Sequence, residues 1–281
     1  MYVSCFNKSC FQQYSNNSNT SKISYGIIGK ASYLRSMSKI PQFKDIIVFE
    51  DDHFIFVNKP AHLSSLDERS GEGLSLLQMA RKYWADAQLC HRLDKETSGL
   101  LLIAKHNDAY KTMAVMFEER KVQKTYHSVV QGYLSVNQKS ILLPLGITAK
   151  GLAKVDMKDG KKAETIITTL QTFNNHTLLA CNPVSGRLHQ IRVHLASQNF
   201  PIVSDVQYGG KMPFLSKFKR GFKTSKWENE QPMMQRVALH AYNLSFNAFD
   251  KNYDVTAPYP KDFDVFMKLL QKHDSESANN F

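Results

Sequence analysis

The sequence contains no apolar run that approaches the roughly 20 residues a helix needs to cross a bilayer. Its four cysteines include no Cys-x-x-Cys pair, which argues against a zinc knuckle and against a disulfide framework. These absences predict a soluble protein with no membrane partner. They also favour a reducing compartment, for which we expect the cytoplasm.

Patterns for bound metals and nucleotide cofactors are missing too. None of the ten histidines lies four residues from another, so no metal site is expected. The chain has neither Gly-x-x-x-x-Gly-Lys-[Ser/Thr] nor Gly-x-Gly-x-x-Gly, the loops that cradle nucleotide phosphates. We therefore expect chemistry that uses no cofactor.

Acidic residues are absent from residues 1–44, which contain six Lys or Arg and are rich in Ser and Asn. This composition predicts a basic, disordered N-terminal extension. It also resembles an organellar transit peptide, which would place the protein in an organelle matrix. Alternatively, translation begins at Met37 and residues 1–36 have no function. Over the whole chain, 36 Lys and Arg against 25 Asp and Glu suit a polyanionic partner.

From Asp45 onward, short strand-like and helix-like segments alternate. Strands are predicted at 46–49, 54–57, 100–104, 124–131, 163–173, 177–181 and 236–247. Helices are predicted at 73–85, 107–120, 187–199 and 261–273. In the first helix we expect Leu74, Leu77 and Trp84 to face the core. One catalytic domain at 45–273 and a disordered tail at 274–281 are predicted.

One stretch combines a single acid with several cations: Cys90-His91-Arg92-Leu93-Asp94-Lys95-Glu96-Thr97-Ser98-Gly99. A Thr-Ser-Gly turn feeding a buried strand would hold Asp94 rigidly at a pocket edge. Because nearby positive charges favour the ionised form, Asp94 is expected to be a carboxylate that can act as nucleophile or base. Taken alone, the stretch could equally be a solvated turn.

A second stretch runs from Pro183 to Leu195 and contains Gly-Arg-Leu-His-Gln-Ile-Arg-Val-His. In the predicted helix, His189 and Arg192 lie close together on a face next to the apolar one. An arginine at such a buried edge needs a carboxylate partner.

Together the two stretches resemble the RluA family of RNA pseudouridine synthases, whose members carry an HRLD segment ending in TSGLLL and, later, a GRxHQIRVH segment. Smaller matches follow in the family's order: Asn58-Lys59-Pro60, Lys124-Thr125-Tyr126, Asp205-Val206-Gln207-Tyr208-Gly209-Gly210 and Leu239-His240-Ala241. The resemblance spans residues 46–272. It implies an α+β catalytic domain with a bent, mainly antiparallel mixed sheet, flanking helices and a cleft across the middle of the sheet.

The resemblance also implies an activity: an isomerase, an intramolecular transferase, that converts specific uridines of ribosomal or transfer RNA to pseudouridine. Asp94 would be the catalytic aspartate, Tyr126 the tyrosine that stacks on the target base, and Arg192 the arginine that pairs with the aspartate. Arg92 would enter the space left by the flipped-out base. Flipping is required because the reacting atoms are inaccessible in a stacked helix.

Further residues are expected to contact RNA or line the pocket. Within the two long motifs, His91, Arg187 and His189 are candidates for RNA contact. Leu239 and His240 are expected to line the pocket.

A basic insertion is predicted at about 211–236, because residues 211–226 hold six cations and no acid, with phenylalanines at four-residue spacing. Its candidate RNA-binding residues are Lys217, Lys219, Arg220 and Lys223. Basic residues between aromatics suit single-stranded RNA. The alternative is an amphipathic segment that packs its phenylalanines on the domain.

Two departures from the family pattern are visible. No segment resembles an S4-type RNA-binding domain, so we expect substrate choice to come from the catalytic domain and its insertion. Ser204 stands where a glycine commonly precedes Asp205. A catalytically idle RNA-binding or ribosome-assembly protein on the same fold is the alternative function. The presence of Asp94, Tyr126 and Arg192 disfavours an idle RNA-binding protein, but a ribosome-assembly factor that acts by binding remains compatible with an intact site. A monomer is expected.

Overall fold

A computed structural model describes residues 41–67, 73–219, 222 and 229–275. Its strands are β1 (Ile47–Glu50), β2 (Phe54–Lys59), β3 (Gln88–Leu89), β4 (Ser98–Ala104), β5 (Gln123–Gln131), β6 (Lys139–Leu142), β7 (Leu145–Ile147), β8 (Ala153–Val155), β9 (Glu164–Thr172), β10 (His176–Pro183), β11 (Leu239–Ala248) and β12 (Lys251–Thr256). Its α-helices are α2 (Leu76–Tyr83), α3 (Asn107–Glu118), α4 (Gln190–Ser197) and α5 (Lys261–His273).

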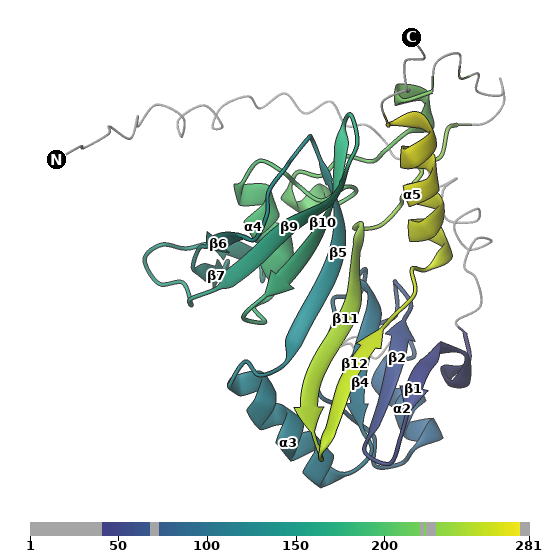
Figure 1. Ribbon diagram of the computed structural model, residues 1–281, viewed down its shortest axis with the longest axis vertical. Coiled ribbons are helices and arrows are strands. Elements are labelled where there is room, and N and C mark those ends of the chain that lie inside the picture. Colours follow the sequence, from purple (N-terminus) through teal and green to yellow (C-terminus); the bar gives the residue numbers. More distant parts are fainter. Residues whose placement is uncertain (1–40, 68–72, 220–221, 223–228, 276–281) are drawn as a thin grey trace. The chain divides into compact units, whose positions relative to one another are not determined.

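Ten of these strands form one sheet in the order β1-β2-β4-β11-β5-β10-β9-β6, with β3 beside β4 and β12 beside β11. Among the described pairings only β4 with β11 is parallel. β7 and β8 form a separate hairpin. Figure 1 shows α2 and α3 at the β1–β2–β4 end of the sheet and α4 and α5 at the other end. The predicted α+β fold with a mainly antiparallel mixed sheet is confirmed.

Strand β4 is the buried centre of the first half of the sheet, and all seven of its residues are buried. Because side chains alternate along a strand, Leu101 and Ile103 join the core that includes α2. Leu100 and Leu102 instead join the core on the other face, which includes α3. The turn that carries Asp94 therefore enters a strand that is fixed on both sides.

Gly99 allows β4 and β11 to approach closely. It pairs in parallel register with Ala241 and has a φ of +114°. A Cβ at this position would lie 2.2 Å from the Ala241 carbonyl oxygen. The glycine of the Thr-Ser-Gly turn is thus needed where the parallel pairing begins.

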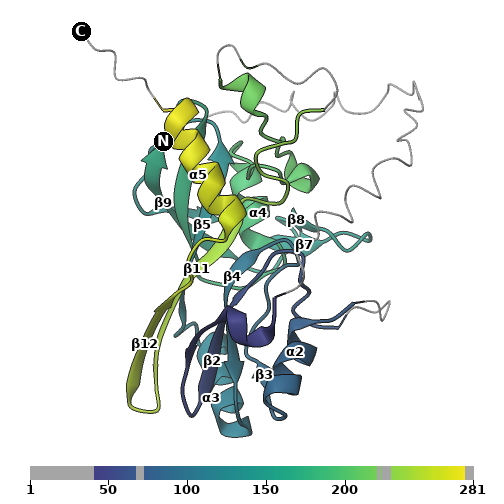
Figure 2. The ribbon, with the colours of Figure 1, turned by 90° about the vertical axis from the view of Figure 1, so that its right-hand side faces the viewer.

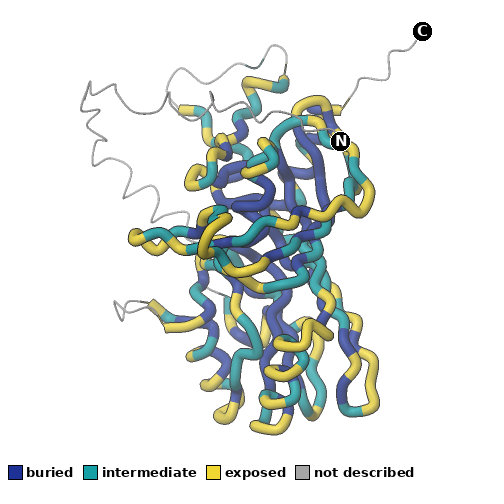
Figure 3. The backbone as a smooth tube through the Cα atoms, turned by 90° about the vertical axis from the view of Figure 1, so that its left-hand side faces the viewer, coloured by how far each residue is buried: buried dark blue, intermediate teal, exposed yellow. Residues whose placement is uncertain are grey.

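The second half of the sheet packs on α4 and α5. Helix α5 occupies the predicted range and buries the predicted stripe of Phe263, Phe266, Met267 and Leu270. These residues share one core with the apolar side of α4 and with β5, β10 and β11. Figure 2 shows both helices at this end, and Figure 3 shows the buried strands running through the interior.

Helix α2 differs from its prediction. It begins after the capping residue Ser75 and buries Leu76, Met79 and Ala80, whereas Trp84 is 42% exposed. The prediction was wrong for Trp84, because the helix ends at Tyr83 and Trp84 follows it with an extended backbone, whereas Leu74 packs against the core as predicted. Phe43 and Asp274, just outside the predicted domain bounds of 45–273, are buried.

No helix in the described ranges is long and apolar enough to span a membrane.

Candidate active site

Asp94 lies in the turn between β3 and β4, and the backbone around it is held in place. The Ser65 hydroxyl accepts a hydrogen bond from the Leu93 N–H at 3.1 Å and donates to the Leu93 carbonyl at 2.8 Å. The Thr97 N–H donates to the carbonyl of Asp94 at 3.1 Å. The Asp94 carboxylate is left 24% exposed at the edge of a cavity.

The start of α4 is anchored by Gln190. Its side-chain amide donates to the Glu164 carbonyl at 2.8 Å, and its oxygen accepts from the Arg187 N–H at 3.1 Å. The preceding residue, His189, has left-handed backbone angles of φ 50° and ψ 24°. Such angles are uncommon outside glycine and are frequent at functional sites. This arrangement brings the His189 ring to Asp94.

Arg192 binds Asp205 as its main partner. Its Nε and Nη2 donate to the two Asp205 oxygens at 2.8 and 2.7 Å. Nη1 lies 3.6 Å from Asp94 Oδ2. The predicted pairing of Arg192 with Asp94 is thus present as an ion pair on the remaining edge of the guanidinium, and the closer pair with Asp205 was not predicted. The reason for the closer pair is burial: the Asp205 side chain is 1% exposed and needs a paired charge more than Asp94 does.

These charges keep Arg192 protonated. Burial alone would lower its pKa, but the hydrogen bonds and charge of Asp205, followed by the charge of Asp94, raise the pKa overall. A fixed positive charge thus faces Asp94.

His189 contacts the same carboxylate. Its Nε2 lies 3.7 Å from Asp94 Oδ2, and its Nδ1 shares a 2.8 Å hydrogen bond with the Tyr208 hydroxyl. Burial lowers the pKa of His189, and the nearby Asp94 charge offsets this only in part. A neutral imidazole at neutral pH follows. His189, which was expected to contact RNA, thus lies next to Asp94.

Tyr126 reaches the cavity from β5. It packs against apolar cores of both halves of the sheet. Burial, and then the charge of Asp94, raise the pKa of Tyr126 above its ordinary value. Its phenol therefore stays protonated at neutral pH.

The cavity beside Asp94 measures about 680 Å³. This lies within the about 300–1,000 Å³ of small-molecule pockets. Its walls include apolar Leu239 and Phe117, and four cations besides Arg192 line it: Arg92, Arg120, Lys124 and Arg187. The Asp94 carboxylate faces an arginine and a histidine in a pocket whose lysines and arginines outnumber its two acids, Asp94 and Glu118. Within the described residues, no group of three or more His, Cys, Asp or Glu could hold a metal ion.

Comparison with known proteins shows the family. Residues 53–197 match the family model for RNA pseudouridylate synthase. The chain is 34% identical over 239 residues to ribosomal large subunit pseudouridine synthase C of Buchnera aphidicola, covering 81% of this chain and 71% of the relative. A protein of the same name from Escherichia coli O157:H7 is 36% identical over 244 residues, covering 84% and 72%.

The chain belongs to the RNA pseudouridylate synthase family. It is an RNA pseudouridine synthase, an isomerase that acts on RNA, as the two long motifs predicted. A solved structure, human RNA pseudouridylate synthase domain containing 4, aligns with a TM-score of 0.61 at 21% identity. It covers 82% of this chain and 95% of that one, which confirms the fold.

His240 and His91, predicted to line the pocket and to contact RNA, are held by hydrogen bonds within the protein. His240 does not line the cavity, because successive strand residues point to opposite faces. Its Nδ1 contacts the Ser98 hydroxyl at 2.9 Å, and its Nε2 donates to the Ala257 carbonyl at 3.1 Å. His91 lines the cavity but accepts a hydrogen bond from the Leu102 N–H at 3.1 Å. Burial lowers the pKa of both histidines to about 4, so both are neutral.

The basic insertion is described only in part. Lys217 and Lys219 are exposed, whereas Arg220 and Lys223 lie outside the described residues. The ring of Phe218 lies 5.2 Å from the ring of His176. This contact supports the packing alternative for that phenylalanine and leaves the two lysines accessible to RNA.

Sequence reasoning missed the roles of Asp205, Tyr208 and Ser65. Asp205 and Tyr208 stand in a motif that was recognised, but without a function assigned to either. The requirement of a buried arginine for a carboxylate was the signal that could have identified Asp205.

Proposed function

We propose that this synthase converts a uridine of ribosomal RNA to pseudouridine, with Asp94 acting on the ribose of a flipped-out nucleotide. The relatives named as ribosomal large subunit pseudouridine synthases support this RNA class. The observation that carries the role of Asp94 is its position at the cavity edge, 3.6 Å from Arg192 and 3.7 Å from His189.

The reaction needs one carboxylate at a sugar carbon. The N1–C1′ bond of uridine breaks, the freed uracil turns, and C5 bonds to C1′. The proton on C5 leaves and N1 gains one, so nothing is consumed. Asp94 either attacks C1′ or removes a proton from C2′, and both routes require the ionised carboxylate. Arg192 orients that carboxylate, and Tyr126 stacks on the base.

The base has to leave its stack before it can enter the cavity. Unstacking costs a few kcal/mol. Arg92 and Arg187 are exposed at the cavity, and their contacts with phosphates offset this cost. Arg92 also enters the space that the base vacates. The exposed Lys217 and Lys219 add phosphate contacts outside the cavity, and His91 and His189 line the cavity that receives the base.

The synthase works as a monomer in the compartment that holds its RNA. This is the cytoplasm, or an organelle matrix if residues 1–36 act as a transit peptide.

Site-by-site pseudouridine mapping of ribosomal and transfer RNA tests the proposal. Cells that lack the protein are complemented with the wild type or with Asp94→Asn. We expect at least one large-subunit ribosomal RNA site to be lost and then restored by the wild type alone. A transfer RNA site in its place would overturn the substrate class. Restoration by both variants would mean that the protein acts by binding.

A further inference from the structure

The turn that carries Asp94 is also held by a buried arginine outside the cavity. We propose that Arg236, oriented by Asp262, positions the catalytic turn for the reaction. Neither residue lines the cavity, so neither is a catalytic residue. The inference rests on the proposed role of Asp94.

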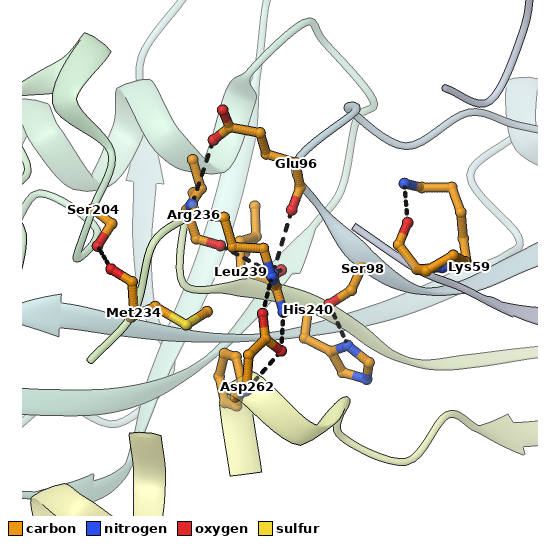
Figure 4. A network of polar contacts seen from close by, with 12 residues as sticks. Lys59, Glu96, Ser98, Ser204, Met234, Arg236, Leu239, His240 and Asp262 are labelled. Atoms are coloured by element: carbon orange, nitrogen blue, oxygen red, sulfur yellow. Dashed lines mark hydrogen bonds and ion pairs between the residues drawn. The ribbon is translucent and has the colours of Figure 1, made fainter. Parts of the chain in front are cut away.

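Arg236 connects three parts of the chain. Its side chain is 1% exposed. Its Nη1 lies 3.2–3.3 Å from the carbonyl oxygens of Glu96, Val237 and Leu239. Its Nε and Nη2 donate to the Asp262 carboxylate at 2.7 and 3.1 Å, as Figure 4 shows. One guanidinium thus joins the Asp94 turn to the start of β11 and to the first turn of α5.

The peptide groups that follow Asp94 are held in place one after another. The Lys95 carbonyl accepts from the His62 N–H at 2.7 Å and from Lys59 Nζ at 3.3 Å. The Glu96 carbonyl accepts from Arg236, and the Glu96 carboxylate accepts from the Val237 N–H at 3.4 Å. The backbone of the turn is therefore fixed by cations and peptide N–H groups from distant parts of the chain.

The backbone matters because the Asp94 side chain is weakly held. Its contacts with Arg192 and His189, at 3.6 and 3.7 Å, are longer than hydrogen bonds. The turn thus decides where its oxygens lie. A misplacement of about 1 Å can cost about 100-fold in rate.

Asp262 sets the orientation of the arginine. Burial raises its pKa, but the hydrogen bonds and charge of Arg236 lower the pKa overall, so the pair is ionised at neutral pH. Asp262 also lies in the first turn of α5, where a negative charge is favoured by the helix dipole. Without the Asp262 carboxylate, the planar guanidinium of Arg236 has no partner that binds it at two points. Its hydrogen bond to the Glu96 carbonyl then loses its fixed orientation.

Asp262→Asn tests the proposal, with Asp264→Asn as its matched control. Asp264 lies in the same helical turn and pairs with Lys268 in an exposed contact at 2.7 Å. The substrate is a ribosomal RNA transcript containing the mapped uridine, labelled with tritium at C5. We measure kcat at saturating RNA, RNA Kd and the thermal melt, and compare rates well below each Tm.

We expect Asp262→Asn to lower kcat at least tenfold with Kd within twofold of the wild type. Asp264→Asn should change neither, and Asp262→Glu should recover most of the rate. Arg236→Lys, if it folds, should also lose kcat, because an ammonium group lacks the planar fork. A folded Asp262→Asn that retains kcat within twofold, or that loses affinity in parallel, overturns the inference. A tritium-releasing Asp94→Asn variant would instead refute the proposed function.

Discussion

Arg192 lies between two carboxylates, with its Nε and Nη2 hydrogen-bonded to Asp205 and its Nη1 3.6 Å from Asp94. The two acids are not equivalent. Asp205 is buried and takes the two-point contact, whereas Asp94 is partly exposed to the cavity. Asp205 therefore fixes the orientation of the Arg192 guanidinium, whose remaining edge faces Asp94. Asp94 thus lies close to a positive charge without a tight hydrogen bond.

Asp205→Asn should destabilise the protein and lower turnover. It removes the charged partner that binds Arg192 at two points and leaves the longer contact with Asp94 at 3.6 Å; breaking a buried pair costs about 3–5 kcal/mol. Asn retains one acceptor oxygen, so we expect the lower end of that range. Denaturant unfolding measures it, with the exposed Asp250→Asn as control. A loss below about 1 kcal/mol would show that Asp205 does not anchor the arginine.

Arg192→Lys should lower turnover far more than RNA affinity. Lysine keeps the charge but cannot hold Asp205 in two places while facing Asp94. Single-turnover rates and a binding isotherm separate the two effects. Equal losses in both would argue that Arg192 contacts RNA.

Acidification should destabilise the fold before its carboxylates titrate. Burial lowers the pKa of His91, His127 and His240 from 6.5 to about 4. Between these pH values the unfolded chain binds protons that the folded chain does not, so the free energy of unfolding falls as pH falls. Each histidine contributes up to about 1.4 kcal/mol per pH unit in this window.

His127→Gln tests that pH dependence. Between pH 6.5 and 4.5, the slope of the free energy of unfolding against pH should be shallower in the variant by about the contribution of one histidine. Unfolding at several pH values measures this slope. At pH 8, where these histidines are neutral in both states, the slope should match the wild type. An unchanged slope at low pH would show that His127 titrates normally in the folded protein.

Patterns local in sequence were the ones that could be predicted. Helix α5 carries its apolar stripe from Phe263 to Leu270, about two turns, and its observed bounds equal the predicted ones. The short strand β12, with mostly exposed residues, offered no such pattern and was not predicted. Asp94, Tyr126 and Arg192 could be proposed because each stands in a compact motif, and all three line the same cavity.

Contacts made by folding could not be predicted in the same way. The support of Leu93 by Ser65 joins residues 28 apart, and that of Glu96 by Arg236 joins residues 140 apart. Ser204, which stands where the family commonly has glycine, has a backbone angle and a contact that the motif does not reveal. Its φ of +63° explains why glycine is common there, and its hydroxyl donates to the Met234 carbonyl at 2.7 Å.

Changing Lys217, Lys219, Arg220 and Lys223 together to Gln should weaken RNA binding and flatten its salt dependence. Replacing one lysine or arginine that neutralises a phosphate should reduce the slope of log affinity against log salt concentration by about 0.7 to 0.9. A variant with Lys82, Lys251, Lys261 and Lys272 changed to Gln removes the same charge from exposed positions elsewhere. Identical slopes in the two variants would mean that the insertion does not bind phosphates specifically.

Asp94→Asn should give a folded protein that binds RNA but forms no pseudouridine. Asn keeps the size of the side chain, and the contacts of the Asp94 carboxylate with His189 and Arg192 lie at 3.7 and 3.6 Å, longer than hydrogen bonds, so the substitution should disturb packing little. Thermal stability should therefore change little. The negative charge that could attack C1′ or remove a C2′ proton is gone.

The same substitution should change the titration of His189 in a direction that follows from the site. The charge of Asp94 raises the pKa of His189 against the lowering effect of burial, so removing that charge should lower the pKa further. The ring signals of His189, followed by NMR across pH, measure this shift. Tritium release from RNA labelled at uridine C5 measures turnover in the same preparation, and a binding isotherm confirms RNA affinity. A lower His189 pKa with no tritium release would agree with the site as described. If the folded variant released tritium near the wild-type rate, Asp94 would not be the catalytic residue, because its charge is the property that both routes require.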